Sequence, residues 1–414
     1  MASSHESIGP DPDRRAFLKA AAVAPAAAGL ASGALAQDAP AKPEALPRRK
    51  LGKTGVELTM LEQGGIRGPT YERILRLAFA NGIRTFDSAK AYGTEGTFGK
   101  WLEQSPEVRK QIFIVTKDTP REPGEMLKQV DERLATLKTD YIDLFFVHGL
   151  GDKHSTDEAV RFVKSKEFGD VADKLKKSGK IKFIGFSSHH QDRAAMMQAA
   201  AEAGIVDAIM LQYRPWIDKD SPLNKAIDAC WKKGVGLISM KQVAGNHLGD
   251  KSAGNILDDV VKRVPVLKER KLTPYQGLLH AIWTDERITS ACVSMRNTDQ
   301  LRENADAARR FEPLKEAQIE QLRDAMLAAG PTLCADCDGR CSRAAGTPAA
   351  LGDLTRFLTY YQQHGDRAIA RDEYAKLSAE ARDWSGADLE AARAACPGNL
   401  DFARLLPEVD RRLA

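Results

Sequence analysis

Short apolar runs alternate with amphipathic helical patterns from residue 58 to about residue 310. Apolar residues that recur every three or four positions predict helices, and short apolar runs between turn residues predict strands. The predicted strands lie at residues 58–61, 83–86, 112–116, 142–147, 183–186, 208–211, 236–240 and 289–294. The predicted helices between them include residues 71–81, 122–137, 170–178, 191–203, 222–233 and 274–283.

Strands that alternate with helices in this way predict a parallel sheet, because parallel neighbours need a long crossover connection. Eight such units in roughly 250 residues favour an α/β fold of the (β/α)8 TIM-barrel type over an open doubly wound sheet. No Gly-x-Gly-x-x-Gly follows the first predicted strand, which also argues against a Rossmann domain.

Two segments interrupt this alternation. Residues 48–60 read as a hairpin with Lys53-Thr54-Gly55 at its turn, and in a barrel it would close the N-terminal mouth. Residues 151–167 follow the fourth predicted strand as a longer insertion. We expect a loop there, on the C-terminal face where loops control substrate access.

The pattern changes at Ala328-Ala329-Gly330-Pro331. Three cysteines follow, and then helical patterns at residues 351–364, 367–377 and 388–395. We therefore predict a barrel over residues 48–330 and a separate, mostly helical, cysteine-containing module over residues 331–414.

The first residues resemble an export signal. Arg14-Arg15 and Phe17-Leu18-Lys19 precede an alanine-rich apolar run, and Ala34-Leu35-Ala36 offers small residues for a signal peptidase. The arginine pair resembles a twin-arginine signal, which predicts a signal peptide over 1–36, a linker over 37–47 and a periplasmic or otherwise exported protein. The alternative is an alanine-rich leader with a chance arginine pair. The twin-arginine export machinery, which carries folded proteins, is thus an expected partner.

Charge and hydropathy exclude two further classes of partner. The formal net charge is +4, and basic and acidic residues are interspersed, so the sequence shows no nucleic-acid footprint. No stretch after residue 36 is apolar for long enough to span a bilayer, so we do not expect an integral membrane protein after signal removal.

Polar residues follow three of the predicted strands and suggest a proton-transfer site. Asp87 follows the second strand, Tyr92 lies in the next loop, and Lys117 and His148 end the third and fourth strands. In a barrel all four meet at the C-terminal mouth. A tyrosine phenol ionises near pH 10, and a neighbouring ammonium lowers its pKa. Asp87 would hold Lys117, and His148 would orient a carbonyl oxygen while Tyr92 donates a proton to it.

The segment from about residue 50 to 310 resembles the aldo-keto reductase superfamily. The Asp, Tyr, Lys and His of that family's catalytic tetrad match Asp87, Tyr92, Lys117 and His148. The resemblance implies that Ser187 and Ser188 of Gly185-Phe186-Ser187-Ser188, together with Gln212, hold the nicotinamide carboxamide, and that the nicotinamide stacks on Tyr213. Ser188 replaces the family's usual asparagine, so one of these hydrogen bonds is expected to change.

The family resemblance extends to the late segment 294–304 and implies an NADP(H) cofactor. In relatives this segment grips the adenosine half, and a basic residue contacts the 2′-phosphate. Here the matching residues are Arg296, Gln300, Glu303 and Asn304. Lys241, in the Met240-Lys241 that replaces a Ser-Pro type of sequence, would approach the pyrophosphate.

The six cysteines divide into two sets. Cys230 and Cys292 lie in apolar runs and are expected to be buried. The remaining four, Cys334, Cys337, Cys341 and Cys396, allow disulfides, a zinc site or an iron–sulfur cluster.

The module resembles the ferredoxin-like extension of one branch of aldo-keto reductases, and three spaced thiols plus a distant Cys-Pro imply at most one 4Fe-4S cluster. A remnant module without metal is the alternative.

These features favour an exported oxidoreductase that moves hydride between a nicotinamide and a small-molecule carbonyl or alcohol. One alternative is an exported electron-transfer or nucleotide-binding protein with an iron–sulfur cluster and a redox partner. Another is a structural or assembly subunit with a barrel. The predicted substrate-facing loops, 118–125, 149–167, 214–221 and 243–256, show no chemical bias that would name a substrate.

Overall fold

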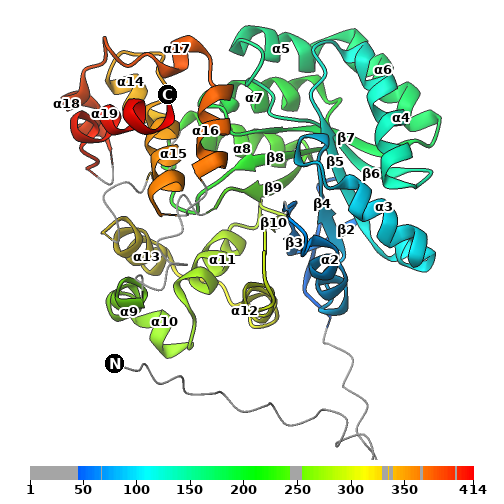
Figure 1. The fold of residues 1–414 in the computed structure, drawn as a ribbon, viewed down its shortest axis with the longest axis horizontal. Coiled ribbons are helices and arrows are strands. Elements are labelled where there is room, and N and C mark those ends of the chain that lie inside the picture. The colour runs from blue at the N-terminus through cyan, green and yellow to red at the C-terminus, as the bar shows by residue number, and fades with distance from the viewer. Residues whose placement is uncertain are drawn as a thin grey trace, which may run out of the picture. The chain divides into compact units, whose positions relative to one another are not determined.

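Eight parallel strands close into a barrel in the computed structural model, with helices around them (Figure 1). The structure describes residues 45–66, 68–242, 254–328, 334, 339–363, 367–396 and 399–414. The predicted signal peptide and Cys337 lie outside these ranges. The barrel strands, in order, are β3 (Leu61–Gln63), β4 (Thr85–Asp87), β5 (Phe113–Asp118), β6 (Ile142–Val147), β7 (Ile181–Ser188), β8 (Ala208–Gln212), β9 (Gly236–Met240) and β10 (Ser290–Val293).

Pairing of the first and last barrel strands closes the sheet. Ala291 of β10 lies opposite Leu61 of β3, and Cys292 lies opposite Glu62. The predicted (β/α)8 barrel is therefore confirmed. The first predicted strand, 58–61, was wrong in its bounds, because it spans the end of one strand and the start of another. Residues Glu57–Thr59 form β2 of a hairpin, and the barrel begins only at Leu61.

Helices lie between the barrel strands and after the last of them, and pack apolar side chains against the outside of the barrel. They are α2 (Tyr71–Ala80), α3 (Glu95–Gln104), α4 (Met126–Leu137), α5 (Thr156–Lys164), α6 (Lys166–Lys177), α7 (Arg193–Ala203), α8 (Pro222–Lys232), α9 (Gly254–Arg263), α10 (Pro265–Glu269), α11 (Pro274–Thr284), α12 (Thr298–Arg309) and α13 (Glu316–Ala328).

The expected loop at 151–167 is largely helical, which corrects the sequence prediction. Ser155 and Glu158 form a capping box that satisfies the first backbone N–H groups of α5. Ala159, Phe162 and Val163 then bury one face of the helix. The sequence pattern of this helix, a capping residue and a few apolar positions, was too short to distinguish a helix from a loop.

The predicted hairpin is present and packs against the barrel interior. β1 (Arg48–Lys50) pairs with β2 (Glu57–Thr59), and the Lys53 N–H donates to the Gly234 carbonyl at 2.7 Å, just before β9 begins. Leu51 and Leu58 join the apolar side chains inside the barrel. The hairpin therefore covers the N-terminal end, opposite the end where catalytic groups of such barrels lie.

The residues after α13 form helices around an apolar cluster of their own. These helices are α14 (Arg340–Ala344), α15 (Leu351–Gln363), α16 (Arg367–Lys376), α17 (Ala379–Arg382), α18 (Leu389–Ala395) and α19 (Phe402–Leu413). Leu354, Phe357 and Leu406 lie in the centre of that cluster. The prediction of a mostly helical C-terminal part agrees with this arrangement, although α14, α17 and α19 were not predicted.

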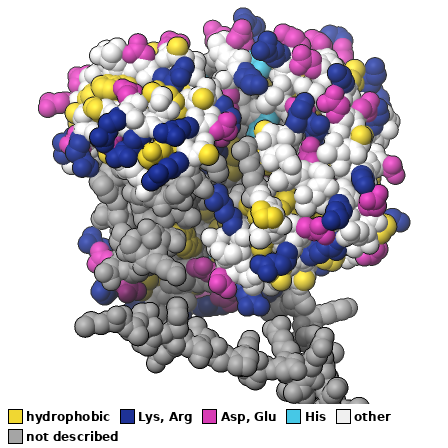
Figure 2. All heavy atoms as spheres, viewed as in Figure 1, with side chains coloured by type: hydrophobic (Ala, Val, Ile, Leu, Met, Phe, Trp, Pro, Cys, Tyr) yellow, Lys and Arg dark blue, Asp and Glu magenta, His cyan; other side chains and the backbone are white. Residues whose placement is uncertain are grey.

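Charges of both signs alternate over the face shown in Figure 2, which matches the balanced composition. Among the helices in the described ranges, none is both long enough and apolar enough to cross a bilayer.

We predict that Gly185→Ala destabilises the barrel by about 3 kcal/mol or more, because a Cβ there would lie 1.8 Å from the Ala208 carbonyl oxygen of the neighbouring strand. Gly169→Ala in α6 is the control, since its Cβ would meet only the Ile205 side chain, at 3.5 Å. That change should add up to about 1 kcal/mol of stability. Denaturant unfolding followed by circular dichroism measures both, and equal midpoints for the two variants would contradict the prediction.

Candidate active site

A buried ion pair lies at the C-terminal mouth of the barrel. Asp87 ends β4, and Lys117 is the penultimate residue of β5. The Lys117 ammonium donates to Asp87 Oδ1 and, at 3.0 Å, to the Ser88 carbonyl. The two side chains are only 1% and 4% exposed. Burial opposes the charge of each group, yet Asp87 and Tyr92 keep the pKa of Lys117 above its ordinary value.

Tyr92 lies between this lysine and a histidine. It ends the short 3-10 helix η1 (Lys90–Tyr92), and its ring centroid is 5.3 Å from Lys117 Nζ. The His148 ring stands edge-on to it, with centroids 5.6 Å apart and an interplanar angle of 89°. The absence of a side chain at Gly65 leaves space for the Tyr92 ring, because a Cβ at residue 65 would lie 2.4 Å from Tyr92 Cδ2. The structure thus brings together all four residues that the sequence placed in one site.

The surroundings fix the protonation of two of these groups. Burial raises the pKa of Tyr92 to about 12, although Lys117 opposes the increase. The expectation that Lys117 brings this pKa below its ordinary value is therefore not met, because burial has the larger effect. Burial and the Lys117 charge lower the pKa of His148 to about 3. At neutral pH the site thus holds a protonated phenol beside a neutral imidazole.

A pocket of about 520 Å³ extends from this site along the barrel mouth. Asp87 and Tyr92 line one part of it, and Tyr275 and Leu278 of α11 line another. The residues proposed for the far half of the cofactor also line it, namely Lys241, Arg296, Gln300, Glu303 and Asn304. The C-terminal helices contribute Tyr360, Asp372 and Glu373 to its wall. One continuous space therefore joins Asp87 and Tyr92 to the residues predicted for the adenosine and pyrophosphate part of the cofactor.

The residues predicted to bind the nicotinamide differ in whether their side-chain polar atoms already have hydrogen-bond partners. Gln212 ends β8, is fully buried, and has no hydrogen-bond partner for either amide atom among the described residues. Ser187 Oγ accepts from the Gly149 N–H at 3.1 Å, and Ser188 Oγ donates to the Leu150 carbonyl at 2.8 Å. Buried amides without partners are costly, so Gln212 fits a residue that binds a ligand carboxamide.

Tyr213 does not occupy the position that the sequence suggested. Its hydroxyl donates to Asp285 Oδ2 at 2.7 Å, and its side chain belongs to the apolar core between strands and helices. The stacking role predicted for this ring does not agree with that placement.

The far end of the pocket contains a helix N-terminus. The Asn297 side chain caps α12 by accepting from the Gln300 N–H at 2.9 Å, and Gln300 Oε1 accepts from the Arg296 N–H at 2.8 Å. Glu303 Oε1 accepts from the Thr273 hydroxyl. A helix N-terminus beside an arginine favours an anionic group.

Lys241 links the pocket to the C-terminal helices. Its Nζ lies 3.8 Å from Glu373 Oε2 of α16, and its backbone has a φ of 53°, a left-handed conformation uncommon for a residue with a side chain. Sequence reasoning missed the contribution of α16, because the α16 pattern shows only that one face is apolar.

Sequence reasoning also missed the position of Cys292. This cysteine is buried, as predicted, but its thiol lies within hydrogen-bonding reach of Asp87 and lines the pocket. Its position in the sequence could have indicated this, because Cys292 lies one residue before the end of the last barrel strand, where site residues gather.

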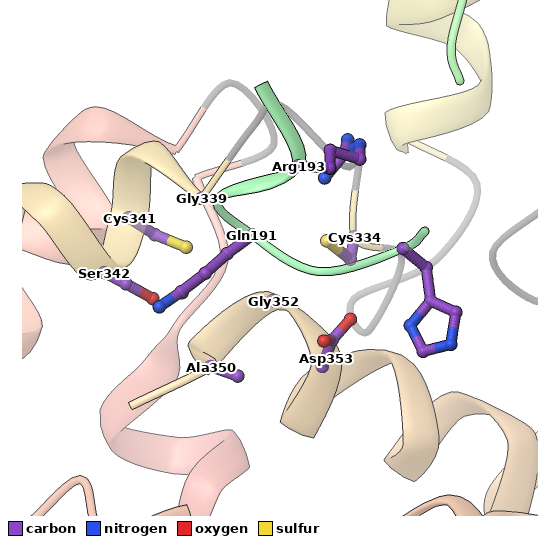
Figure 3. A pocket seen from close by; sticks show the side chains of 10 residues that line it. Gln191, Arg193, Cys334, Gly339, Cys341, Ser342, Ala350, Gly352 and Asp353 are labelled. Atoms are coloured by element: carbon purple, nitrogen blue, oxygen red, sulfur yellow. The ribbon is translucent and has the colours of Figure 1, made fainter. Parts of the chain in front are cut away.

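Two of the C-terminal cysteines share a small cavity of about 30 Å³. The sulfur atoms of Cys334 and Cys341 are directed toward it in Figure 3, and His189 and Gln191 also line it. Burial and the nearby Cys396 raise the pKa of Cys341 to about 11. Within the described ranges, which omit Cys337, no three His, Cys, Asp or Glu side chains are grouped closely enough to bind a metal.

Comparison with known proteins gives a consistent result. The family model described as "Aldo/keto reductase family" matches residues 56–326. L-galactose dehydrogenase of Arabidopsis thaliana is 28% identical over 293 residues, which cover 64% of this chain and 89% of that protein. L-glyceraldehyde 3-phosphate reductase of Escherichia coli O157:H7 is 26% identical over 328 residues, covering 66% and 91%.

A solved aldo-keto reductase from Bacillus halodurans, in its holo form, has the same fold. It superposes with a TM-score of 0.50 at 19% identity, covering 68% of this chain and 96% of that one.

We predict that Lys117→Met destabilises the protein by roughly 3–5 kcal/mol, because it leaves the buried Asp87 carboxylate without its cation. The double variant with Asp87→Asn removes both charges and should recover most of that loss. The free energies of unfolding of the parent, the two single variants and the double variant together give the interaction energy between Lys117 and Asp87. Additive losses in the double variant would contradict the buried pair.

Proposed function

The chain belongs to the aldo/keto reductase family, and from that premise we propose that Tyr92 is the residue that exchanges the proton in its reaction. The protein is an NAD(P)-dependent oxidoreductase that acts on carbonyl compounds. The observation that carries the proposal is the position of the Tyr92 phenol, beside Lys117 and His148 in a pocket that continues to Arg296.

Each side chain of the site has a separate role in carbonyl reduction. A bound reduced nicotinamide supplies the hydride to the carbonyl carbon. The neutral His148 imidazole donates a hydrogen bond to the carbonyl oxygen and orients it. Tyr92 gives its proton to that oxygen, so that an alcohol forms and a phenolate remains. The Lys117 ammonium stabilises the phenolate, and Asp87 keeps the ammonium in place. In the reverse direction the phenolate accepts the alcohol proton.

The cofactor end of the pocket supports NADP(H). In this proposal Gln212, helped by Ser187 and Ser188, binds the nicotinamide carboxamide, and Lys241 approaches the pyrophosphate. Arg296, at the N-terminus of α12, binds the 2′-phosphate, with Gln300, Glu303 and Asn304 beside it. Two observations favour it: the buried Gln212 amide has no hydrogen-bond partner among the described residues, and Arg296 lines the same pocket as Tyr92.

A second, independent proposal concerns the C-terminal cysteines. Cys334, Cys337, Cys341 and Cys396 would hold one 4Fe-4S cluster, which would give the module a one-electron redox centre. The shared cavity of Cys334 and Cys341 and the nearness of Cys396 to Cys341 support it. The leader with Arg14-Arg15 suits such a protein, because the twin-arginine route exports folded proteins to the periplasm.

We predict that Tyr92→Phe lowers kcat for carbonyl reduction by about a hundredfold to ten-thousandfold and leaves NADPH binding nearly unchanged. Steady-state kinetics and fluorescence titration with NADPH and NADH measure the two effects. Tyr141→Phe is the control, because that phenol stacks on Arg109 away from the pocket. A Tyr92→Phe enzyme with the parent's turnover would refute the mechanism.

The cluster proposal predicts a broad visible absorption band in protein purified without oxygen, together with bound iron and sulfide. Cys396→Ser should abolish the band, whereas Cys230→Ser, a buried thiol of the barrel, should keep it. Colourless parent protein that contains zinc, or whose mass shows disulfides, would reject the cluster.

A further inference from the structure

Glu62 is a carboxylic acid inside the barrel that the mechanism above does not use. It is the middle residue of β3, is fully buried, and lies opposite Cys292 of β10. The interior there is otherwise mainly apolar, with aromatic and aliphatic side chains such as Phe146 and Val115. Within the described part of the chain, neither carboxyl oxygen makes a hydrogen bond of good geometry, although the Ser290 hydroxyl lies close enough to interact with it.

The groups around Glu62 determine its charge. Asp87 of β4, Lys117 of β5 and the Cys292 thiol and Ser290 hydroxyl of β10 face it. The single cation among them is already paired with Asp87, and the Ser290 hydroxyl donates to the Thr59 carbonyl at 2.7 Å. An ionised Glu62 would therefore be a buried charge with no counterion of its own, which is strongly unfavourable.

The neutral form avoids this cost. Burial, together with the Asp87 carboxylate, raises the pKa of Glu62 to about 8, while Ser290 and Lys117 oppose the increase only in part. A carboxyl group that is costly to bury and adjacent to catalytic groups is typical of a functional role.

We propose that Glu62 is a positioning residue for proton transfer, which stays protonated beneath the Asp87–Lys117 pair at neutral pH and changes the charge acting on Tyr92 when it ionises in alkali. The proposal rests on the proposed function of Tyr92. While Glu62 is neutral, the Lys117 ammonium acts fully on the phenol and favours the phenolate. Once Glu62 is an anion, it offsets part of that positive field, and Tyr92 holds its proton more tightly.

The test compares the parent with Glu62→Gln, which is neutral at every pH. Above neutral pH, Tyr92 should lose its proton more easily in the variant. The pH at which kcat for reduction falls, and the pH at which kcat for alcohol oxidation rises, should therefore both be lower in the variant, by roughly half to one unit. Asp143→Asn removes a buried carboxylate that is paired with Arg109, and its profile should follow the parent's.

Two further readouts do not depend on turnover. Infrared spectra of the parent at neutral pH should contain the carbonyl band of a protonated carboxylic acid, which alkali removes and Glu62→Gln lacks. Glu62→Met should also unfold at a higher temperature than the parent, by a margin that grows between about pH 5 and pH 8. This sign follows because the folded parent keeps a proton that the unfolded chain releases in that range.

The possible outcomes separate the two claims. A parent that reduces no carbonyl compound refutes the function of Tyr92 and, with it, the role of Glu62. An active parent whose pH profile is unchanged in Glu62→Gln refutes the role of Glu62 alone, and so does a parent without the infrared band. If Glu62→Gln does not fold, the profile and band of Glu62→Met decide the question in the same way.

Discussion

The buried contact between Lys117 and Asp87 is the interaction on which the site depends. A lysine at 1% exposure would release its proton without a counterion, and the carboxylate of Asp87 prevents that. The contact also holds the ammonium beside the Tyr92 ring and near His148, where its charge adds to the effect of burial in keeping the imidazole neutral. Burial is the main cause of the protonation states of Tyr92, His148 and Glu62, and the charges of this ion pair act on all three groups.

Much of this arrangement could be predicted because barrel topology converts sequence order into spatial proximity. Asp87, Lys117 and His148 lie at the C-terminal ends of three neighbouring strands, so their proximity follows once the barrel is predicted. The features that were missed depend on the direction of single side chains. All three residues of β3 are buried, so no alternation of polar and apolar positions revealed that Glu62 lies beside Asp87. Tyr213 follows the last residue of β8, where the strand no longer dictates which way a ring points.

The balance between burial and charge could not be predicted from the sequence either. The sequence shows that a lysine lies near Tyr92, but not how much water the phenol loses. Here burial has the larger effect, and the pKa of Tyr92 rises to about 12. For a group that must donate a proton, a protonated resting state is suitable, and Lys117 then acts mainly on the phenolate that the reaction produces.

The helices after residue 340 form part of the pocket wall through Tyr360, Asp372 and Glu373. Their folding and occupation of the pocket are therefore thermodynamically linked, since a ligand that touches this wall binds only when α16 is in place. Such a ligand should make the C-terminal helices slower to exchange amide hydrogens and harder for a protease to cut. Conversely, damage to the cysteine cavity, which lies between Gln191 and Arg193 of the barrel and the first C-terminal helices, should weaken ligand binding by destabilising the helices that form the pocket wall.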